Sequence, residues 1–342
     1  MRERDFYRAL CGVDPNAEND LLTVIDGSEL GAKCLLSNGT LRYETDSRFF
    51  SAHSDTFFES LVCGETEIDG QRLLCERLSR EAHIVLCGGG YVSMALLTVS
   101  RTLGIPVTVL EDRAEFADHA RAAGADRVIC APFERGLARI EGDDGAYFII
   151  ATRGHESDKV CLAAIARKKY AYIGMLGSRK RVSILKQALI DEGAPKEVIA
   201  RVHAPIGLDI AAETPGEIAV SVMAEIIAVK NRSGRSAGFS REILRAILEE
   251  RESEPLALAT IVRRSGSAPR SVGTRMLARA DGRCTGTIGG GFAEAKIRLA
   301  AQNRLQNIVS EPEILRIDMT NPEAAQLGMI CGGTIEVLLE TI

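Results

Sequence analysis

Short apolar runs alternate with helix-like segments through the middle of the chain. Residues 84–87 are apolar and run directly into three glycines, and the helix-like residues 94–103 follow. A Gly-Ile-Pro stop leads to a second apolar run at 107–110, which ends in two acids. A buried strand, a helix and a second buried strand form a β-α-β unit, and such units are typical of a parallel sheet.

The same alternation continues as far as residue 231. It predicts strands at 127–130, 146–152 and 170–174, and helices at 114–123, 153–169, 179–192 and 215–229. We therefore predict an α/β protein whose residues 80–231 form a Rossmann-like domain with a doubly wound parallel sheet. The small and polar residues 231–239 read as a linker after it.

Smaller α+β segments flank this domain on both sides. In residues 236–342 the pattern predicts helices at 240–251 and 293–307 and strands at 256–262 and 334–340. Residues 1–78 resemble a shortened copy of that segment: residues 22–25 match 259–262, Gly31 matches Gly273, and Cys63-Gly64 matches Cys331-Gly332. We interpret them as a degenerate repeat, with chance similarity as the alternative.

Composition narrows the function classes. A net charge of −5 and an aromatic content of 5% disfavour nucleic-acid binding, which needs basic surface and stacking platforms. No stretch approaches the ~20 apolar residues of a membrane span, and the start does not resemble a signal peptide. The nine cysteines are scattered without a C-x-x-C pair, so we expect reduced thiols and a cytoplasmic protein.

A glycine-rich turn follows the first strand of the Rossmann-like domain. Residues 88–93 read G-G-G-Y-V-S, a form of G-x-G-x-x-S between a strand and a helix. Gly88 and Gly90 would let the backbone approach a diphosphate, and Glu111 or Asp112 would accept a hydrogen bond from a ribose hydroxyl. The alternative is a Rossmann-shaped sheet that binds no dinucleotide.

A polar loop with several arginines follows the strand at 256–262. It reads R-R-S-G-S-A-P-R over residues 263–270. Ser265, Gly266, Ser267 and Arg270 offer hydroxyls, free amides and a guanidinium group, which suit phosphate or another oxyanion. A plain turn would explain the glycine and proline but not the charge.

Three consecutive glycines precede the helix expected at 293–307. Gly289, Gly290 and Gly291 leave the helix N-terminus open to an anion or a heterocycle. Glu294 lies in the first helical turn, where it either caps the helix or hydrogen-bonds the ring nitrogens of a ligand.

One cysteine stands out from the other eight. Cys331 is followed by Gly332 and Gly333, which would leave its thiol accessible for binding a soft metal or carrying sulfur. A structural cysteine is the alternative. His155 and His203 follow strands of the predicted sheet, and a neutral, hydrogen-bonded histidine is the default for each.

Several of these segments resemble one known family. The segments are YIGMLGSRKR at 172–181, HAPIGLDIAAETP at 203–215, EIAVSVMAEII at 217–227, SGSAPR at 265–270, GTIGGG at 286–291 and CGG at 331–333. Together they closely resemble the xanthine dehydrogenase accessory (XdhC/CoxI) family over about residues 84–342. Residues 80–231 resemble its Rossmann-type domain, and residues 236–342 resemble its other domain in intact form.

Members of this family are maturation factors for molybdenum hydroxylases. The resemblance implies transient binding of the molybdenum cofactor (molybdopterin), its sulfuration by a cysteine desulfurase, and insertion into an apo-hydroxylase of the xanthine dehydrogenase type. On this sequence it implies a pterin phosphate held by residues 289–291 and Arg270. Cys331 would approach the molybdenum of the bound cofactor.

The order of domains departs from the family pattern, because the SGSAPR domain usually precedes the Rossmann domain. We hypothesise that the first copy has become structural and that the last copy holds the ligand. The interpretation favours a cofactor chaperone over a turnover enzyme. An NAD(P)-binding oxidoreductase and a nucleotide-binding regulatory protein are the alternatives, with NAD(P) or another nucleotide in the Rossmann domain. The architecture would also suit a homodimer.

Overall fold

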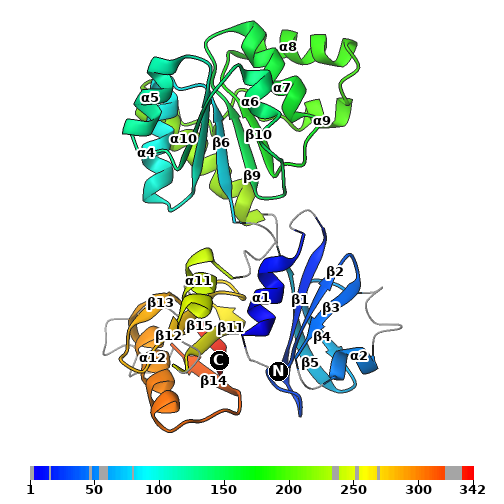
Figure 1. The fold of residues 1–342 in the computed structure, drawn as a ribbon, viewed down its shortest axis with the longest axis vertical. Coiled ribbons are helices and arrows are strands. Elements are labelled where there is room, and N and C mark those ends of the chain that lie inside the picture. The colour runs from blue at the N-terminus through cyan, green and yellow to red at the C-terminus, as the bar shows by residue number, and fades with distance from the viewer. Residues whose placement is uncertain are drawn as a thin grey trace. The chain divides into compact units, whose positions relative to one another are not determined.

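The computed structural model describes residues 4–14, 17–45, 48–53, 61–78, 81–232, 239–250, 254–267, 270–319 and 333–342. The chain divides into two compact units (Figure 1). Residues 1–79 and 235–342 form the first unit, and residues 80–234 form the second. Each unit has hydrophobic clusters of its own.

The second unit is built on a five-stranded parallel sheet in the order β10-β9-β6-β7-β8. Its strands are β6 (His83–Cys87), β7 (Val107–Glu111), β8 (Arg127–Cys130), β9 (Ala146–Ile150) and β10 (Tyr172–Met175). The chain starts in the centre, moves outward to one side and then to the other. This is the Rossmann arrangement, so the predicted α/β fold class is confirmed.

Helices cover both faces of this sheet. They are α4 (Tyr91–Thr102), α5 (Ala114–Ala122), α6 (Phe133–Leu137), α7 (His155–Ile165), α8 (Arg179–Asp191), α9 (Lys196–Ala200) and α10 (Pro215–Arg232). α4, α5 and α10 pack on one face, and α6, α7, α8 and α9 on the other. The short helices α6 and α9 were not predicted, because a single turn or two leaves little periodicity to read.

Local capping fixes where several helices begin. The Ser178 and Ser240 hydroxyls accept backbone N–H groups of the first turns of α8 and of α11 (Arg241–Glu249). At the start of α10, Glu217 and Thr214 cap each other's backbone N–H groups. The N–H groups of Glu213 and Thr214, which donate to the Glu217 carboxylate, lower the pKa of that side chain.

The first unit contains two antiparallel sheets with the same strand order, β3-β2-β1-β5-β4 and β13-β12-β11-β15-β14. The half of the unit that contains the first sheet consists of α1 (Asp5–Gly12), β1 (Asn19–Asp26), β2 (Lys33–Ser37), β3 (Thr40–Glu44), α2 (Phe49–Ala52), β4 (Gly64–Ile68) and β5 (Gln71–Leu78). The half that contains the second sheet consists of α11, β11 (Ala257–Gly266), β12 (Arg275–Ala278), β13 (Cys284–Gly286), α12 (Gly291–Gln306), β14 (Glu313–Asp318) and β15 (Gly333–Thr341).

Strand register makes the two sheets equivalent residue by residue. Leu22 lies between Cys34 and Cys75, as Ala259 lies between Met276 and Leu339. Both central strand pairs shift register at the same place, after Val24 in one sheet and after Ile261 in the other. We refer to the two halves, α1 to β5 and α11 to β15, as the first copy and the second copy.

Equivalent residues of the two copies also meet at the contact between them. Residues 25 and 74 of the first copy cluster with their counterparts 262 and 338. The second shared cluster contains Leu21 with Leu258, Leu35 with Leu277, Phe6 with Ile243, and Leu10 with Ile247. The copies therefore pack with approximate two-fold symmetry, like the two protomers of a symmetric dimer.

Buried ion pairs repeat this symmetry. Lys33 of β2 pairs with Glu340 of β15, and the equivalent Arg275 of β12 pairs with Glu76 of β5. All four side chains are at most 7% exposed. The Arg275 guanidinium also lies over the ring of Phe239. Removing one member of such a buried pair takes away the nearby opposite charge of the other, which is strongly destabilising.

The strand register contradicts the predicted equivalence of Cys63-Gly64 and Cys331-Gly332. Gly64 begins β4, whereas Gly333 begins β15, which is the counterpart of β5. By register, the counterpart of Gly333 is Asp69, at the turn that joins β4 to β5. Strand register is determined by which side chains are buried. A two-residue Cys-Gly match does not contain that information and therefore cannot align the strands.

The helices are short or polar by the standard of a bilayer. Within the described ranges, none of them combines the length and the apolar composition that crossing a membrane requires.

Candidate functional site

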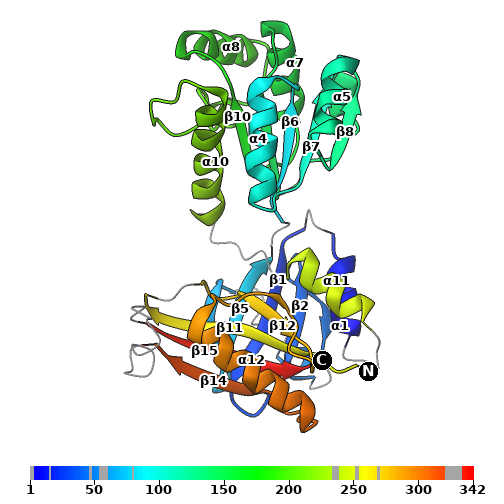
Figure 2. The ribbon, with the colours of Figure 1, turned by 90° about the vertical axis from the view of Figure 1, so that its left-hand side faces the viewer.

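The motif loops of the second copy gather at one end of its sheet. β11 and β13 both run antiparallel to β12, so both leave the sheet at the same end. β15 enters at that end, where Gly266 is directly opposite Gly333. Residues 265–267, the triple glycine after β13 and the last glycine of the CGG segment therefore lie at the same end of the sheet. Figure 2 shows β11, β12 and β15 of this sheet.

Close backbone packing explains why position 333 is glycine. A Cβ atom there would lie 2.7 Å from the Ser265 carbonyl oxygen and 2.9 Å from the backbone of Ser267. Carbon and oxygen atoms do not approach so closely without a backbone shift. The final glycine of the CGG segment thus fits against the SGS segment, which brings two motifs distant in sequence into contact.

The triple glycine forms a turn that other residues would adopt only with strain. Gly289, Gly290 and Gly291 have φ values of 124°, 72° and 61°. Within this turn the Gly289 N–H donates to the Thr287 hydroxyl, at 3.1 Å, and the Gly290 N–H donates to Glu294, also at 3.1 Å. The Thr287 hydroxyl donates to the same Glu294 oxygen.

Glu294 therefore caps its own turn at the N-terminus of α12. Of the two roles predicted for it, the structure shows the capping contact. This carboxylate places a negative charge where a phosphate was predicted, so it disfavours a phosphate at that position. The Gly289 and Gly290 N–H groups are both used within the turn. A phosphate at this end of the sheet has to rely on other donors.

Exposed groups of the SGSAPR loop supply such donors. Arg264, Ser265, Ser267 and Arg270 are all exposed. Arg263 is different, because its guanidinium donates to Glu65 of the first copy, at 3.1 Å from Nε to Oε2. Of the three arginines around this loop, Arg264 and Arg270 carry the exposed positive charge.

Cys331 and Gly332 lie outside the described residues, and Gly333 is the nearest described position.

The Rossmann unit has a second candidate site at the carboxyl end of β6. A Cβ on Gly88 would lie 2.4 Å from the Ala151 carbonyl oxygen, so the glycine allows the turn to pass close to the end of β9. Gly90 is open, since a Cβ added to it would have no atom within 4 Å, and it precedes α4 without a side-chain cap. This is the crevice where Rossmann sheets bind ligands.

Glu111 does not have the role predicted for it. Its side chain is 1% exposed, and its carboxylate accepts the Gly89 N–H at 2.6 Å and the Arg113 Nε–H at 2.8 Å. Burial opposes ionisation, but these donors lower its pKa. Glu111 thus holds the glycine turn. Asp112, with a side chain 42% exposed, is the acid of the pair that can reach a ribose hydroxyl.

Two arginines and a phenylalanine beside this turn were missed in the sequence. The Arg113 and Arg153 guanidinium groups lie 3.8 Å and 4.4 Å from the ring centroid of Phe116. A Cβ on Gly89 would lie 3.3 Å from the Phe116 Cβ, so this cationic cluster borders the glycine turn. The signal was available, since each arginine lies within three residues of the end of a predicted strand.

The two predicted histidine positions differ, since a hydrogen-bond partner is seen for His203 and only exposure for His155. His203 Nδ1 lies 3.0 Å from Glu225, which also accepts the Tyr172 hydroxyl and the Gly207 N–H. Burial acts to raise the pKa of Glu225, but these hydrogen bonds lower it overall. His155 is exposed at the start of α7.

Comparison with known proteins places this arrangement in a family. Residues 84–226 match the model of the XdhC Rossmann domain, and residues 250–318 match the model of the XdhC and CoxI family. The fold and motif loops define a Rossmann protein with an XdhC/CoxI-type domain. The chain belongs to the XdhC/CoxI family.

Individual relatives match parts of the chain. It is 32% identical over 151 residues to the protein YqeB of Escherichia coli K12, covering 44% of this chain and 28% of that protein. It is 29% identical over 160 residues to a Bacillus subtilis protein named as a probable xanthine dehydrogenase subunit, covering 47% and 46%. The chain thus spans less than half the length of both curated relatives.

A solved structure is similar at low identity. A crystal structure described as a xanthine dehydrogenase from Bacillus halodurans has 21% identity and a TM-score of 0.48, covering 68% of this chain and 64% of that one.

Proposed function

We propose that this chain is an accessory factor for a molybdenum hydroxylase of the xanthine dehydrogenase type. It binds the molybdenum cofactor through the second copy during sulfuration by a cysteine desulfurase, and then passes it to the apo-enzyme. The observation that carries the proposal is the contact between the SGS segment and Gly333, at the sheet end that also holds the triple glycine.

The exposed residues at this sheet end fit the chemistry of such a ligand. Arg264 and Arg270 are free of the Glu65 pairing that neutralises Arg263, and guanidinium groups bind phosphate through two hydrogen bonds. The Ser265 and Ser267 hydroxyls can donate to or accept from a pterin ring. When bound, the cofactor supplies a molybdenum–sulfur centre, and a thiolate from Cys331 is the kind of ligand that such a soft centre prefers.

A variant of Cys331 tests this function. Wild-type protein, Cys331→Ala and the control Cys284→Ala, which removes an exposed cysteine of the second copy, are each co-expressed with a client hydroxylase in a molybdenum-replete host. The pterin fluorescence released from each purified protein and the activity of the client are measured. We expect both to fall in Cys331→Ala alone. Unchanged pterin retention would return Cys331 to a structural role.

The Rossmann unit supports a second proposal, that it binds a nucleotide such as NAD(P). The open Gly90, the exposed Asp112 and the Arg113–Phe116–Arg153 cluster lie around one glycine turn. Calorimetric titration of NAD and NADP into the wild type and Asp112→Ala tests it, with Asp118→Ala on α5 as the control. Binding that is weakened in Asp112→Ala alone supports the site, and no binding to the wild type rejects these two ligands.

A further inference from the structure

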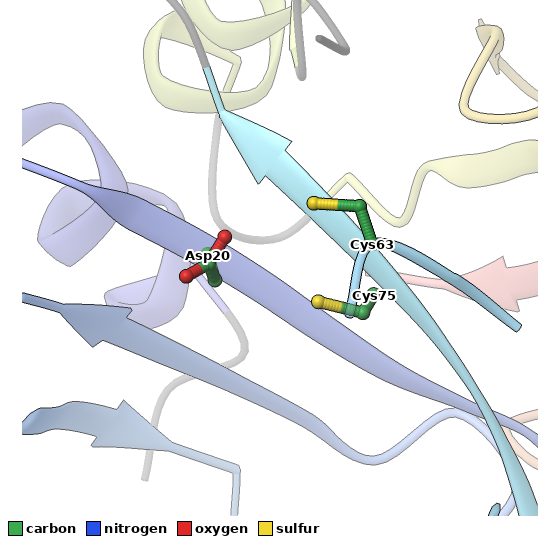
Figure 3. A group of neighbouring side chains, drawn as sticks. All are labelled: Asp20, Cys63 and Cys75. Atoms are coloured by element: carbon green, nitrogen blue, oxygen red, sulfur yellow. The ribbon is translucent and has the colours of Figure 1, made fainter. Parts of the chain in front are cut away.

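The first copy contains a cluster of metal-ligand side chains away from the loops discussed above. Asp20 lies on β1, Cys75 on β5, and Cys63 immediately before β4. One carboxylate oxygen and the two sulfur atoms lie within 4.8 Å of one another. Both sulfurs point to the side of β5 where Asp20 lies (Figure 3). Three strands that are adjacent in the sheet thus converge on one point.

The second copy shows that the fold does not need these residues. By register, the counterparts of Asp20 and Cys75 are Ala257 and Leu339, and Pro312 occupies the place of Cys63. In the second copy, therefore, the same three positions of the fold carry apolar side chains. In the first copy all three positions carry a group that can ligate a metal, including a carboxylate that is only 5% exposed. Packing alone gives no reason for that combination.

The donor set indicates the class of ion. Two thiolates and one carboxylate suit a thiophilic divalent cation such as Zn²⁺, which binds four ligands in a tetrahedron. Three protein ligands leave one position for water or an external group. Cys63 is exposed, so an ion can enter from solvent, whereas Asp20 and Cys75 are buried.

Local charge is balanced with such an ion in place. Asp20 accepts a hydrogen bond from the Arg77 Nε–H through Oδ1, which leaves Oδ2 for a metal and fixes the carboxylate. Two thiolates, one carboxylate, one dication and one guanidinium sum to zero, while the Glu18 carboxylate on the other side of Arg77 is 73% exposed and solvated. A neutral cluster is what a largely buried site requires.

We propose that Asp20, Cys63 and Cys75 bind one Zn²⁺-class cation that ties the start of β4 to β5 and β1. This site shares no residue with the proposed cofactor site in the second copy. It gives the first copy a binding role of its own, and it reassigns Cys63 from a relic of the CGG motif to a metal ligand.

Titration of the full chain with Co²⁺, under a phosphine reductant, tests the site. Cobalt bound by thiolates gives a sulfur-to-metal charge-transfer absorption, and we expect it to saturate at one equivalent. Because Cys63 is exposed, Cys63→Ser should fold like the wild type, as a circular dichroism melt would verify. Loss of an outer-shell partner already weakens metal binding about 10–100-fold, so we expect loss of the Cys63 ligand to weaken binding at least that much. Cys75→Leu, which installs the residue of the second copy, should abolish the absorption.

Matched variants separate this site from other thiols. Cys130→Ser removes an exposed cysteine of the Rossmann unit and should leave the titration unchanged. Asp20→Asn should keep the charge-transfer absorption and weaken binding by about 10-fold or more. The proposal is overturned if the wild type gives no such absorption. It is equally overturned if the absorption survives Cys63→Ser and disappears in Cys331→Ser.

Discussion

The two copies of the first unit have the same arrangement of strands but different connecting loops. Strand order, register and the position of the register shift agree. The connections differ: β4 and β5 are joined by Asp69 and Gly70 alone, whereas residues 319–332, with Cys331 among them, separate β14 from β15. Asp69 and Gly70 have φ values of 47° and 73°, as tight hairpin turns require.

This difference separates what the fold requires from what a ligand requires. The shared residues are those that bury the contact between the copies, such as Leu21 and Leu258, or that pair charges across it. The unshared ones are the SGSAPR loop, the triple glycine and the CGG segment. The two copies also share hydrophobic clusters. A truncation that removes residues 236–342 would therefore expose the core of the first copy, so it is not a suitable test of ligand binding.

The largest effect should come from breaking the symmetric ion pairs. Arg275→Met removes the guanidinium that pairs with the buried Glu76 carboxylate, so we expect the first unit to lose about 3–5 kcal/mol of unfolding free energy. Hydrogen exchange of the β1 and β11 amides measures this loss. The control Arg263→Met removes a guanidinium that is 40% exposed and should cost less than about 1 kcal/mol.

A double variant sharpens the result. Glu76→Leu combined with Arg275→Met removes both charges, and it should recover most of the lost stability. If the double variant were as unstable as Arg275→Met alone, the cost would lie in packing rather than in the loss of the ion pair.

A smaller effect should follow from filling the space at the motif contact. In Gly333→Ala the new Cβ would meet the Ser265 carbonyl oxygen at 2.7 Å, and we expect a loss of about 1–3 kcal/mol. Gly12→Ala, in α1 of the first copy, has no atom within 4 Å of the new Cβ and should be neutral or slightly stabilising. Urea unfolding compares them, and equal midpoints would contradict the observed contact.

The smallest stability effect should come from Glu294. Glu294→Gln keeps an acceptor for the Gly290 N–H but removes the charge at the helix N-terminus, which should cost about 1 kcal/mol. Removing this anion should also tighten binding of an anionic ligand, roughly fivefold for about 1 kcal/mol. Calorimetry with pyrophosphate measures the change. Weaker binding would favour direct contact of Glu294 with the ligand instead.

Much of the fold could be predicted from the sequence, since its signals are local. Strands such as 84–87 and 107–110 are short, mostly apolar runs, and Ser178 and Ser240 mark helix starts. The pairing of Lys33 with Glu340 could not be predicted, because it depends on how two distant segments pack. The same holds for Glu111, whose position after a strand suggested a ribose contact although its side chain turns inward.

The candidate site was predictable in its motifs but not in its contacts. The glycines at 289–291 indicated a special turn, and the structure confirms their left-handed backbone. That Glu294 closes this turn, and that Glu65 of the other copy neutralises Arg263, depends on side-chain positions that no spacing rule specifies. The Asp20–Cys63–Cys75 cluster was missed because its members are neighbours only across strands.

If the second copy alone binds the cofactor, charge variants of the two copies should differ in their effect on cofactor affinity. The most direct measurement is the Kd of the full chain for the molybdenum cofactor in two charge-matched variants, Arg270→Ala in the second copy and Arg42→Ala on exposed β3 of the first. We predict that Arg270→Ala raises the Kd about tenfold or more and that Arg42→Ala leaves it unchanged. Equal values for the two variants, or a larger rise in Arg42→Ala, would contradict the claim.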